Sequence, residues 1–132
     1  MTHPNVELAR RGFAAFAAGD RATIEALVDD EAVWRIPGRS DLAGEHSGRD
    51  AILAMLRQTT VRTGGSYRAV FEAALADDDR VVALYRAQGE RPGRSLDIRQ
   101  LLVIRIADGR WAEIDAVPFD LYAFDAFWDG AE

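Results

Sequence analysis

Apolar residues recur every three or four positions near the start of the chain, and this spacing is typical of amphipathic helices. A first helix is predicted over about residues 5–18, and Gly19 ends it. Asp20 can accept hydrogen bonds from free amides of a following turn, so it is the expected N-cap of a second short helix. A third helix is predicted over residues 50–60. Its inward residues are expected to be Ile52, Leu53, Met55 and Leu56.

Later in the chain, short apolar runs end at turn residues, and this pattern predicts strands. One strand is expected over residues 32–36, followed by a polar loop over residues 39–48. Four further strands are expected over residues 67–76, 80–90, 95–107 and 110–118. Asp108-Gly109 is suited to a two-residue hairpin turn, because both residues tolerate positive φ angles. Helices followed by an antiparallel meander predict an α+β fold with helices on one face of the sheet.

Composition supports one domain over residues 1–132, since 48% apolar residues are enough for a single core. The net charge is −6 and the 16 basic residues are spread along the chain, which argues against a nucleic-acid partner. With no cysteine, a disulfide framework or a thiolate metal site is excluded. No run reaches the roughly 20 apolar residues of a membrane span and no signal peptide is seen. A cytoplasmic protein is expected.

Four segments together carry a family resemblance: residues 16–20, residues 32–38, residues 44–52, and the hairpin around Asp108-Gly109-Arg110. In order and spacing they resemble the nuclear transport factor 2-like superfamily, specifically its SnoaL-like and ketosteroid isomerase-like domains. The resemblance covers nearly the whole chain. It implies a cone-shaped half barrel of curved antiparallel sheet, packed on three N-terminal helices, with a C-terminal aromatic helical tail. It also implies a small-molecule pocket inside the cone.

The known catalytic residues of this superfamily are mostly absent here. Where steroid isomerases carry a tyrosine on the first helix, this chain has about Gly12, and where they carry the base it has Ile36. Their second acid would fall near Leu101 or Leu102, and the last-strand aspartate of limonene epoxide hydrolases would fall at Ala116. The chain is therefore expected to be neither a standard ketosteroid isomerase nor a limonene epoxide hydrolase. No metal or cofactor is expected, because no cluster has ligand spacing and no glycine-rich phosphate loop follows a strand.

A two-residue turn at Asp108-Gly109 would set two pairs of residues opposite each other in the last hairpin. These pairs are Leu101 with Ala116 and Val103 with Ile114. By resemblance, the face that carries these four residues is the concave one and lines the pocket. Trp34 and Ile36 on the first strand are predicted to add an aromatic and apolar wall, although Trp34 could equally be an ordinary core residue.

The turn at Pro92-Gly93 similarly sets Arg86 opposite Arg99 and Gln88 opposite Asp97, and these residues would line the open end of the pocket. Asp97 is the candidate base, and Arg99 or Arg86 would stabilise developing negative charge. His46 is the second candidate proton-transfer group, because imidazole titrates near neutral pH. The alternative is that these charges form a structural ion-pair network or a solvated strand end.

The tail over residues 119–128 carries aromatic residues at helical spacing. It is expected either to cap the pocket, with Tyr122 as a candidate ligand contact, or to pack against a second subunit. Opposite the predicted pocket face, the sheet is also apolar, so we expect a homodimer through this outer face. The residues assigned to it are Tyr85, Leu102, Ile104, Ile106, Trp111 and Val117.

These residues and the family resemblance support two classes of function. The first is an enzyme that performs cofactor-independent acid-base chemistry on a hydrophobic metabolite, by isomerisation, cyclisation, dehydration or hydrolysis. The second is a protein without catalytic activity, either a ligand-binding module or a dimeric interaction scaffold. For the enzyme and the ligand-binding module, the partner is a hydrophobic small molecule.

Overall fold

The computed structural model describes residues 3–130. Its helices and strands follow one another as α1 (Pro4–Ala18), α2 (Arg21–Leu27), β1 (Val28–Ile36), β2 (Gly44–Ser47), α3 (Arg49–Val61), β3 (Arg68–Ala76), β4 (Arg80–Arg91), β5 (Arg94–Ala107), β6 (Arg110–Pro118) and α4 (Leu121–Trp128). The three predicted N-terminal helices and the four-strand meander are confirmed to within two residues at each boundary, except that α2 gives way to β1 at Val28. The predicted polar loop over residues 39–48 is wrong in part, because it contains the short strand β2.

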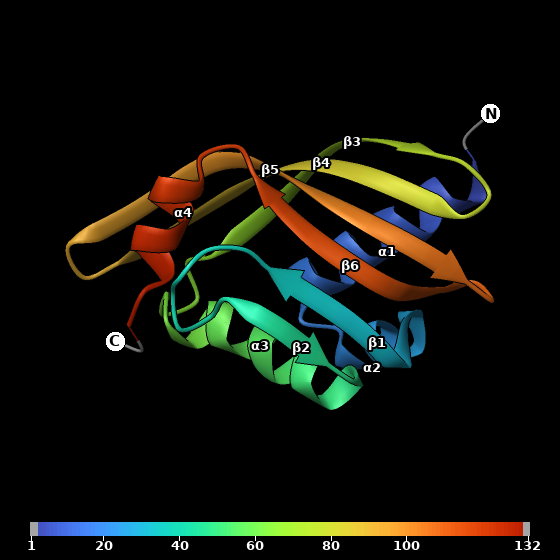
Figure 1. Ribbon diagram of the computed structural model, residues 1–132, viewed down its shortest axis with the longest axis horizontal. Helices are drawn as coiled ribbons and strands as arrows, with labels where there is room; N and C mark the ends of the chain where they lie inside the picture. The colour runs from blue at the N-terminus through green and yellow to red at the C-terminus, as the bar shows by residue number, and fades with distance from the viewer. Residues whose placement is uncertain (1–2, 131–132) are drawn as a thin grey trace.

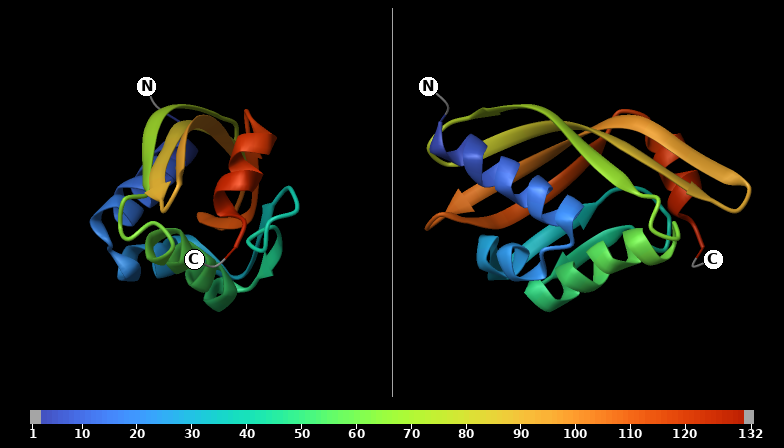
Figure 2. Two further views of the ribbon diagram at one scale, coloured as in Figure 1. Left: turned by 90° about the vertical axis from the view of Figure 1, so that its left-hand side faces the viewer. Right: turned by 180° about the vertical axis from the view of Figure 1, so that it is seen from behind.

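The six strands form one curved sheet in the order β2-β1-β6-β5-β4-β3 (Figure 1). All neighbouring strands are antiparallel except β1 and β6, which are parallel. Seen from behind, α1 crosses the concave side of the sheet and α2 and α3 lie below it, whereas α4 lies at one end (Figure 2). The predicted α+β cone is therefore confirmed, with a mixed rather than purely antiparallel sheet.

Polar residues at the helix ends explain where the helices begin. Asp20 caps α2 as predicted, because its Oδ1 accepts from the backbone amide of Thr23 at 3.1 Å. Gly19, which ends α1, has a φ of 66°, a left-handed conformation that glycine adopts without strain. At α4, Asp120 accepts from the backbone amide of Ala123 at 3.0 Å.

None of the helices over residues 3–130 is long and apolar enough to cross a bilayer.

An irregularity in β6 changes the register of the last hairpin. Ile106 pairs with Trp111, but Arg105 pairs with Glu113, so Ala112 is an extra residue in β6. The predicted pairs were wrong by one residue as a result. Leu102 lies opposite Ala116 and Ile104 lies opposite Ile114. Because alternate strand residues point to opposite faces, this shift moves Leu102 and Ile104 to the concave face.

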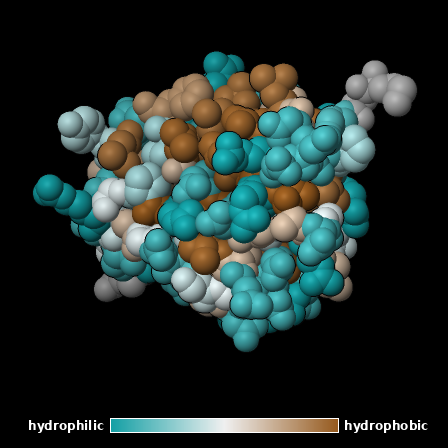
Figure 3. Space-filling model, turned by 45° about the vertical axis from the view of Figure 1, so that its right-hand side comes forward, coloured by the Kyte–Doolittle hydropathy of each residue, from teal (hydrophilic) through white to brown (hydrophobic). Residues whose placement is uncertain are grey.

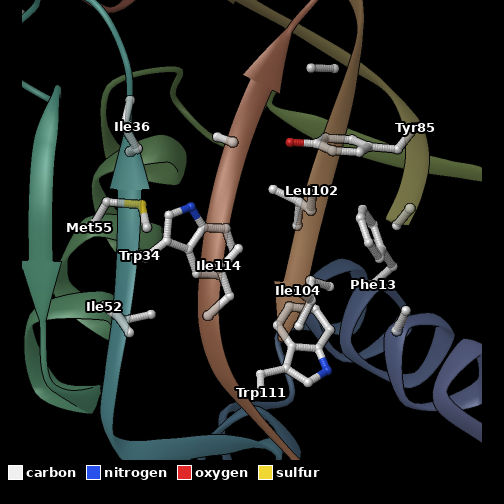
Figure 4. Packing of buried hydrophobic residues seen from close by; sticks show 14 of the residues in the cluster. Phe13, Trp34, Ile36, Ile52, Met55, Tyr85, Leu102, Ile104, Trp111 and Ile114 are labelled. Carbon is white, nitrogen blue, oxygen red and sulfur yellow. The ribbon is translucent and has the colours of Figure 1, made fainter. Parts of the chain in front are cut away.

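The hydrophobic core lies between the concave face of the sheet and the helices. Trp34 of β1, Met55 of α3 and Ile114 of β6 point toward one another in Figure 4. Phe13 of α1 packs edge to face against Tyr85 of β4, with ring centroids 4.9 Å apart. The side chains that β4, β5 and β6 contribute to the core all come from one face of the sheet.

Candidate functional site

A cavity of about 90 Å³ lies inside the cone, between the sheet and helices α1, α2, α3 and α4. Most of the side chains around it are apolar, and they come from elements far apart in the sequence. Those that form its walls include Phe13, Trp34, Met55, Leu102, Ala116 and Trp128. A partly open and mainly apolar site of this kind suits a small apolar ligand.

Thr59 of α3 lines the cavity but donates to the Leu56 carbonyl of its own helix, and three further polar side chains reach the cavity. They are Tyr67, which immediately precedes β3, Tyr85 of β4 and Gln100 of β5. Gln100 lies directly opposite Tyr85 in the sheet, and its Nε2 donates to the Tyr85 hydroxyl at 2.7 Å. Burial raises the pKa of both tyrosines well above the ordinary value, so both hydroxyls are neutral at pH 7. The cluster therefore offers hydrogen bonds but no charge.

Part of the predicted pocket wall lies at the cavity. Trp34, Ile36 and Ala116 all line it. Ile114 is fully buried in the core on the same face of the sheet as Ala116.

Leu101 and Val103, which were also assigned to the pocket wall, lie instead on the outer face of the sheet. Leu101 pairs with Val117 and Val103 pairs with Asp115, and both side chains are half-buried. The prediction was wrong because it assumed a regular hairpin without the extra residue at Ala112.

The polar residues predicted to line the open end of the pocket have the expected strand pairing, but they lie on the outer face of the sheet, away from the cavity. Arg86 does pair with Arg99 and Gln88 with Asp97. Because β4 places Tyr85 toward the cavity, its neighbour Arg86 points outward, and Arg99, Gln88 and Asp97 share that side. The Arg86 and Asp97 side chains are ion-paired at 3.0 Å on the exposed surface.

Arg99 forms a second ion pair on the same face, with Glu72 at 3.0 Å. His46 lies on the edge strand β2, and its Nε2 is within 2.9 Å of the Leu42 carbonyl oxygen. None of Asp97, Arg99 and His46 lines the cavity in the described part of the chain. The predicted catalytic group is therefore not assembled at one site.

The structure also explains Gly12, which stands about where steroid isomerases carry a tyrosine. A Cβ atom at Gly12 would overlap the indole ring of Trp111, which packs directly against α1. The Trp111 Nε1 donates to the Leu8 carbonyl at 3.3 Å and holds the ring in this position. Any larger residue at Gly12 would displace Trp111 from the cavity wall.

The tail helix α4 closes one end of the cavity. Phe124, Phe127 and Trp128 are buried, and Phe124 and Trp128 line the cavity. Of the two predicted roles, the cap matches this position. Tyr122 is 90% exposed on the other side of the helix, so its prediction as a ligand contact is wrong in this arrangement.

Buried arginines hold the end of α4. Arg91 Nη1 donates to the Phe127 carbonyl and Nη2 to the Gly130 carbonyl, both at 2.6 Å. Arg62 donates to the carbonyls of Trp128 and Gly130. Cations near the last carbonyls of a helix are favourable, because these oxygens have no partner within the helix.

Asp125 fastens the middle of α4 to the loop after β1. Its carboxylate accepts from the backbone amides of Arg39 at 2.8 Å and of Ser40 at 2.7 Å. We expect Asp125→Ala to lower the free energy of unfolding by about 1–3 kcal/mol, because two backbone donors lose a charged acceptor. Urea denaturation measures this, with Asp129→Ala as the control on the same tail. An equal effect of both variants would contradict a fastening role for Asp125.

Comparison with known proteins agrees with this architecture. A family model described as the SnoaL-like domain matches residues 9–114. An uncharacterized protein of Mycobacterium tuberculosis is 33% identical over 125 residues, which cover 94% of this chain and 95% of that protein. A protein of Mycobacterium bovis matches equally well.

Solved structures show the same fold. The structure of Bal32a, from a soil-derived mobile gene cassette, has a TM-score of 0.92 and 42% identity, covering 95% of this chain and 96% of Bal32a. An NTF2-like protein of unknown function from Burkholderia pseudomallei has a TM-score of 0.84 at 20% identity, covering 98% of this chain and 100% of that one. The matched family model spans most of the sequence and the fold agrees with it, so the chain belongs to the SnoaL-like domain family.

Proposed function

We propose that this SnoaL-like protein binds an apolar small molecule inside its cone. The observation that carries the proposal is a mainly apolar cavity inside the cone with one neutral polar cluster, formed by Tyr67, Tyr85 and Gln100. Apolar walls provide most of the affinity in such sites, and a few polar groups set the orientation of the ligand.

Binding is better supported than acid-base catalysis by the residues predicted from the sequence. The cavity lining, within residues 3–130, includes no carboxylate, imidazole or guanidinium group. The two tyrosine hydroxyls have raised pKa values, so they act as hydrogen-bond donors and not as bases at neutral pH. A ligand held here therefore has no group beside it that would abstract a proton.

The size of the cavity limits the ligand it accepts without rearrangement. An engineered cavity of about 150 Å³ in another protein takes up benzene, whereas this one encloses about 90 Å³. A ligand larger than a single ring would therefore not fit unless the side chains or helices around the cavity move. A polycyclic ligand would require α4 or the Met55 side chain to move outward, and the thioether chain of methionine adapts readily.

Toluene is a suitable probe for this proposal. We expect saturable binding of toluene when the backbone amide chemical shifts are measured in a titration. The shifts that change should belong mainly to cavity-lining residues. Ala116→Leu adds three carbon atoms at the cavity wall and is expected to weaken toluene binding at least about tenfold, since the space is occupied. Ala17→Leu adds the same atoms on an exposed part of α1 and serves as the control. Absence of toluene binding to the unmodified protein would contradict the proposal.

We also propose that the protein forms a homodimer through the outer face of the sheet. Five of the six residues predicted for this face are instead buried on the concave side, and only Val117 faces outward. A different apolar set supports the same conclusion. Val70, Leu75 and Val117 are exposed, and Val82, Leu84, Leu101 and Val103 are half-buried beside them.

Charges of both signs border this apolar area. Arg35 is paired with Glu45, Glu113 and Asp115 at 3.2–3.3 Å, and the Arg86–Asp97 pair lies farther along the sheet. Figure 3 shows one face of the molecule on which apolar patches are interrupted by hydrophilic side chains. A surface that carries positive and negative side chains beside apolar residues can be complementary to the same surface on a second copy of the protein.

A further inference from the structure

We infer that Tyr67, Tyr85 and Gln100 form a subsite for a hydroxyl group on the ring of the ligand, so that the preferred ligand is a phenol. This inference rests on the proposed binding function and names the class of ligand. The observation behind it is the Oε1 atom of Gln100, a buried acceptor beside the cavity that no described donor reaches.

Gln100 is 2% exposed, and one end of its amide is already occupied. Its Nε2 donates to the Tyr85 hydroxyl at 2.7 Å, which fixes the plane of the amide and leaves the buried Oε1 as the end without a described donor. Buried amide oxygens almost always have a donor, and a buried acceptor without one is destabilising. A ligand that donates a hydrogen bond to Oε1 would remove this cost.

The two tyrosines supply the complementary group. Tyr85 accepts from Gln100, so its own proton is still available for donation, and the neutral Tyr67 hydroxyl also has a proton to donate. The cluster therefore has an acceptor at its Gln100 end and hydroxyl donors at its tyrosine end.

A hydroxyl group is the simplest ligand group that matches both ends, because it donates one hydrogen bond and accepts others. An ether or a ketone oxygen accepts only and would leave Oε1 without a donor. The remaining walls favour an aromatic ring to carry this hydroxyl. Phe13, Trp34 and Trp128 line the cavity, and aromatic side chains pack well against the face or edge of another ring.

Three probes of similar size test the inference. Phenol and toluene differ only by a hydroxyl in place of a methyl group, and anisole carries an oxygen that accepts but cannot donate. In a purely apolar cavity toluene would bind more tightly than phenol, because the hydroxyl loses its hydration. We expect the opposite order, with phenol bound roughly tenfold more tightly than toluene and than anisole, measured by titration of amide chemical shifts.

Gln100→Met replaces the amide by an apolar side chain of similar shape. This variant is expected to lose the roughly tenfold preference for phenol while it retains toluene binding. The matched control is Gln88→Met, the same substitution on the outer face of the neighbouring strand, which should keep the preference. If Gln100→Met does not fold, Tyr85→Phe is the second variant, because it removes the hydroxyl that orients the amide and is expected to reduce the same preference.

The outcomes separate this inference from the proposed function. If toluene binds and phenol binds no more tightly, the inference is wrong and the binding function stands. Tighter binding of anisole than of phenol would also overturn it, since that would mean that the amide presents its donor to the ligand. If none of the three probes binds, the proposed function itself fails.

Discussion

Trp128→Ala is expected to lower the free energy of unfolding by about 3–5 kcal/mol, because it removes a large and almost fully buried side chain. Trp128 is only 1% exposed, and its ring packs edge to face against Tyr67 and Phe127 with centroid distances of 5.3 Å and 4.8 Å. Domains of this kind are stable by about 5–15 kcal/mol, so a loss of this size is a large fraction of the total. The same substitution should also widen the cavity at the end that α4 closes.

Tyr122→Ala is the matched control, since it truncates an aromatic residue of the same helix that is almost fully exposed. This change is expected to alter the free energy of unfolding by less than about 0.5 kcal/mol. Urea denaturation followed by circular dichroism measures both variants. Equal stability of Trp128→Ala and Tyr122→Ala would show that α4 is not docked over the cavity.

Val103→Arg is expected to convert a homodimer to monomers, raising the dissociation constant at least about a hundredfold. Val103 lies on β5, near the middle of the outer face, opposite Val82 on one side and Asp115 on the other. An arginine here would bury one added charge from each subunit in the proposed interface. In the monomer the same arginine could reach solvent, so the fold should survive.

Sedimentation velocity distinguishes the dimer from a 14.6 kDa monomer. Ala54→Arg, which introduces the same charge on the exposed surface of α3, is the control and should leave the dimer intact. A monomeric unmodified protein at micromolar concentration would contradict the homodimer before any variant is made.

Local sequence patterns were sufficient for the elements of this fold. The spacing of Val6, Ala9 and Phe13 identifies the buried face of α1, and Asp20 identifies the start of α2. These features depend on residues within a few positions of one another, so a single sequence contains them. The strand β2 was missed, because Gly44–Ser47 has no apolar alternation and is held as a strand by pairing with β1.

The candidate site was predicted less well than the fold. An error of one residue in the strand register assigned the residues of the outer face to the concave face, and those of the concave face to the outer face. A useful signal was present in β4, where Arg86, Gln88 and Glu90 alternate with Tyr85 and with small residues. This alternation places the polar and charged residues outward and Tyr85 inward, as observed. In β5 the run from Leu101 to Ile104 is apolar on both faces, so its composition does not identify the inward side.

By itself, the sequence determined the helices, the order of the strands along the chain, the pairing of β4 with β5 and the family resemblance, since these follow from local periodicity and turn chemistry. Only the tertiary structure decided which face of the sheet surrounds the cavity, because the extra residue at Ala112 shifts the pairing of β6 by one position. It also decided that Tyr67 reaches the cavity beside Tyr85 and Gln100, which the pairing of β4 with β5 already sets opposite each other. The Tyr67 side chain comes from the segment before β3, and only the packing of the folded chain brings it to the same cavity.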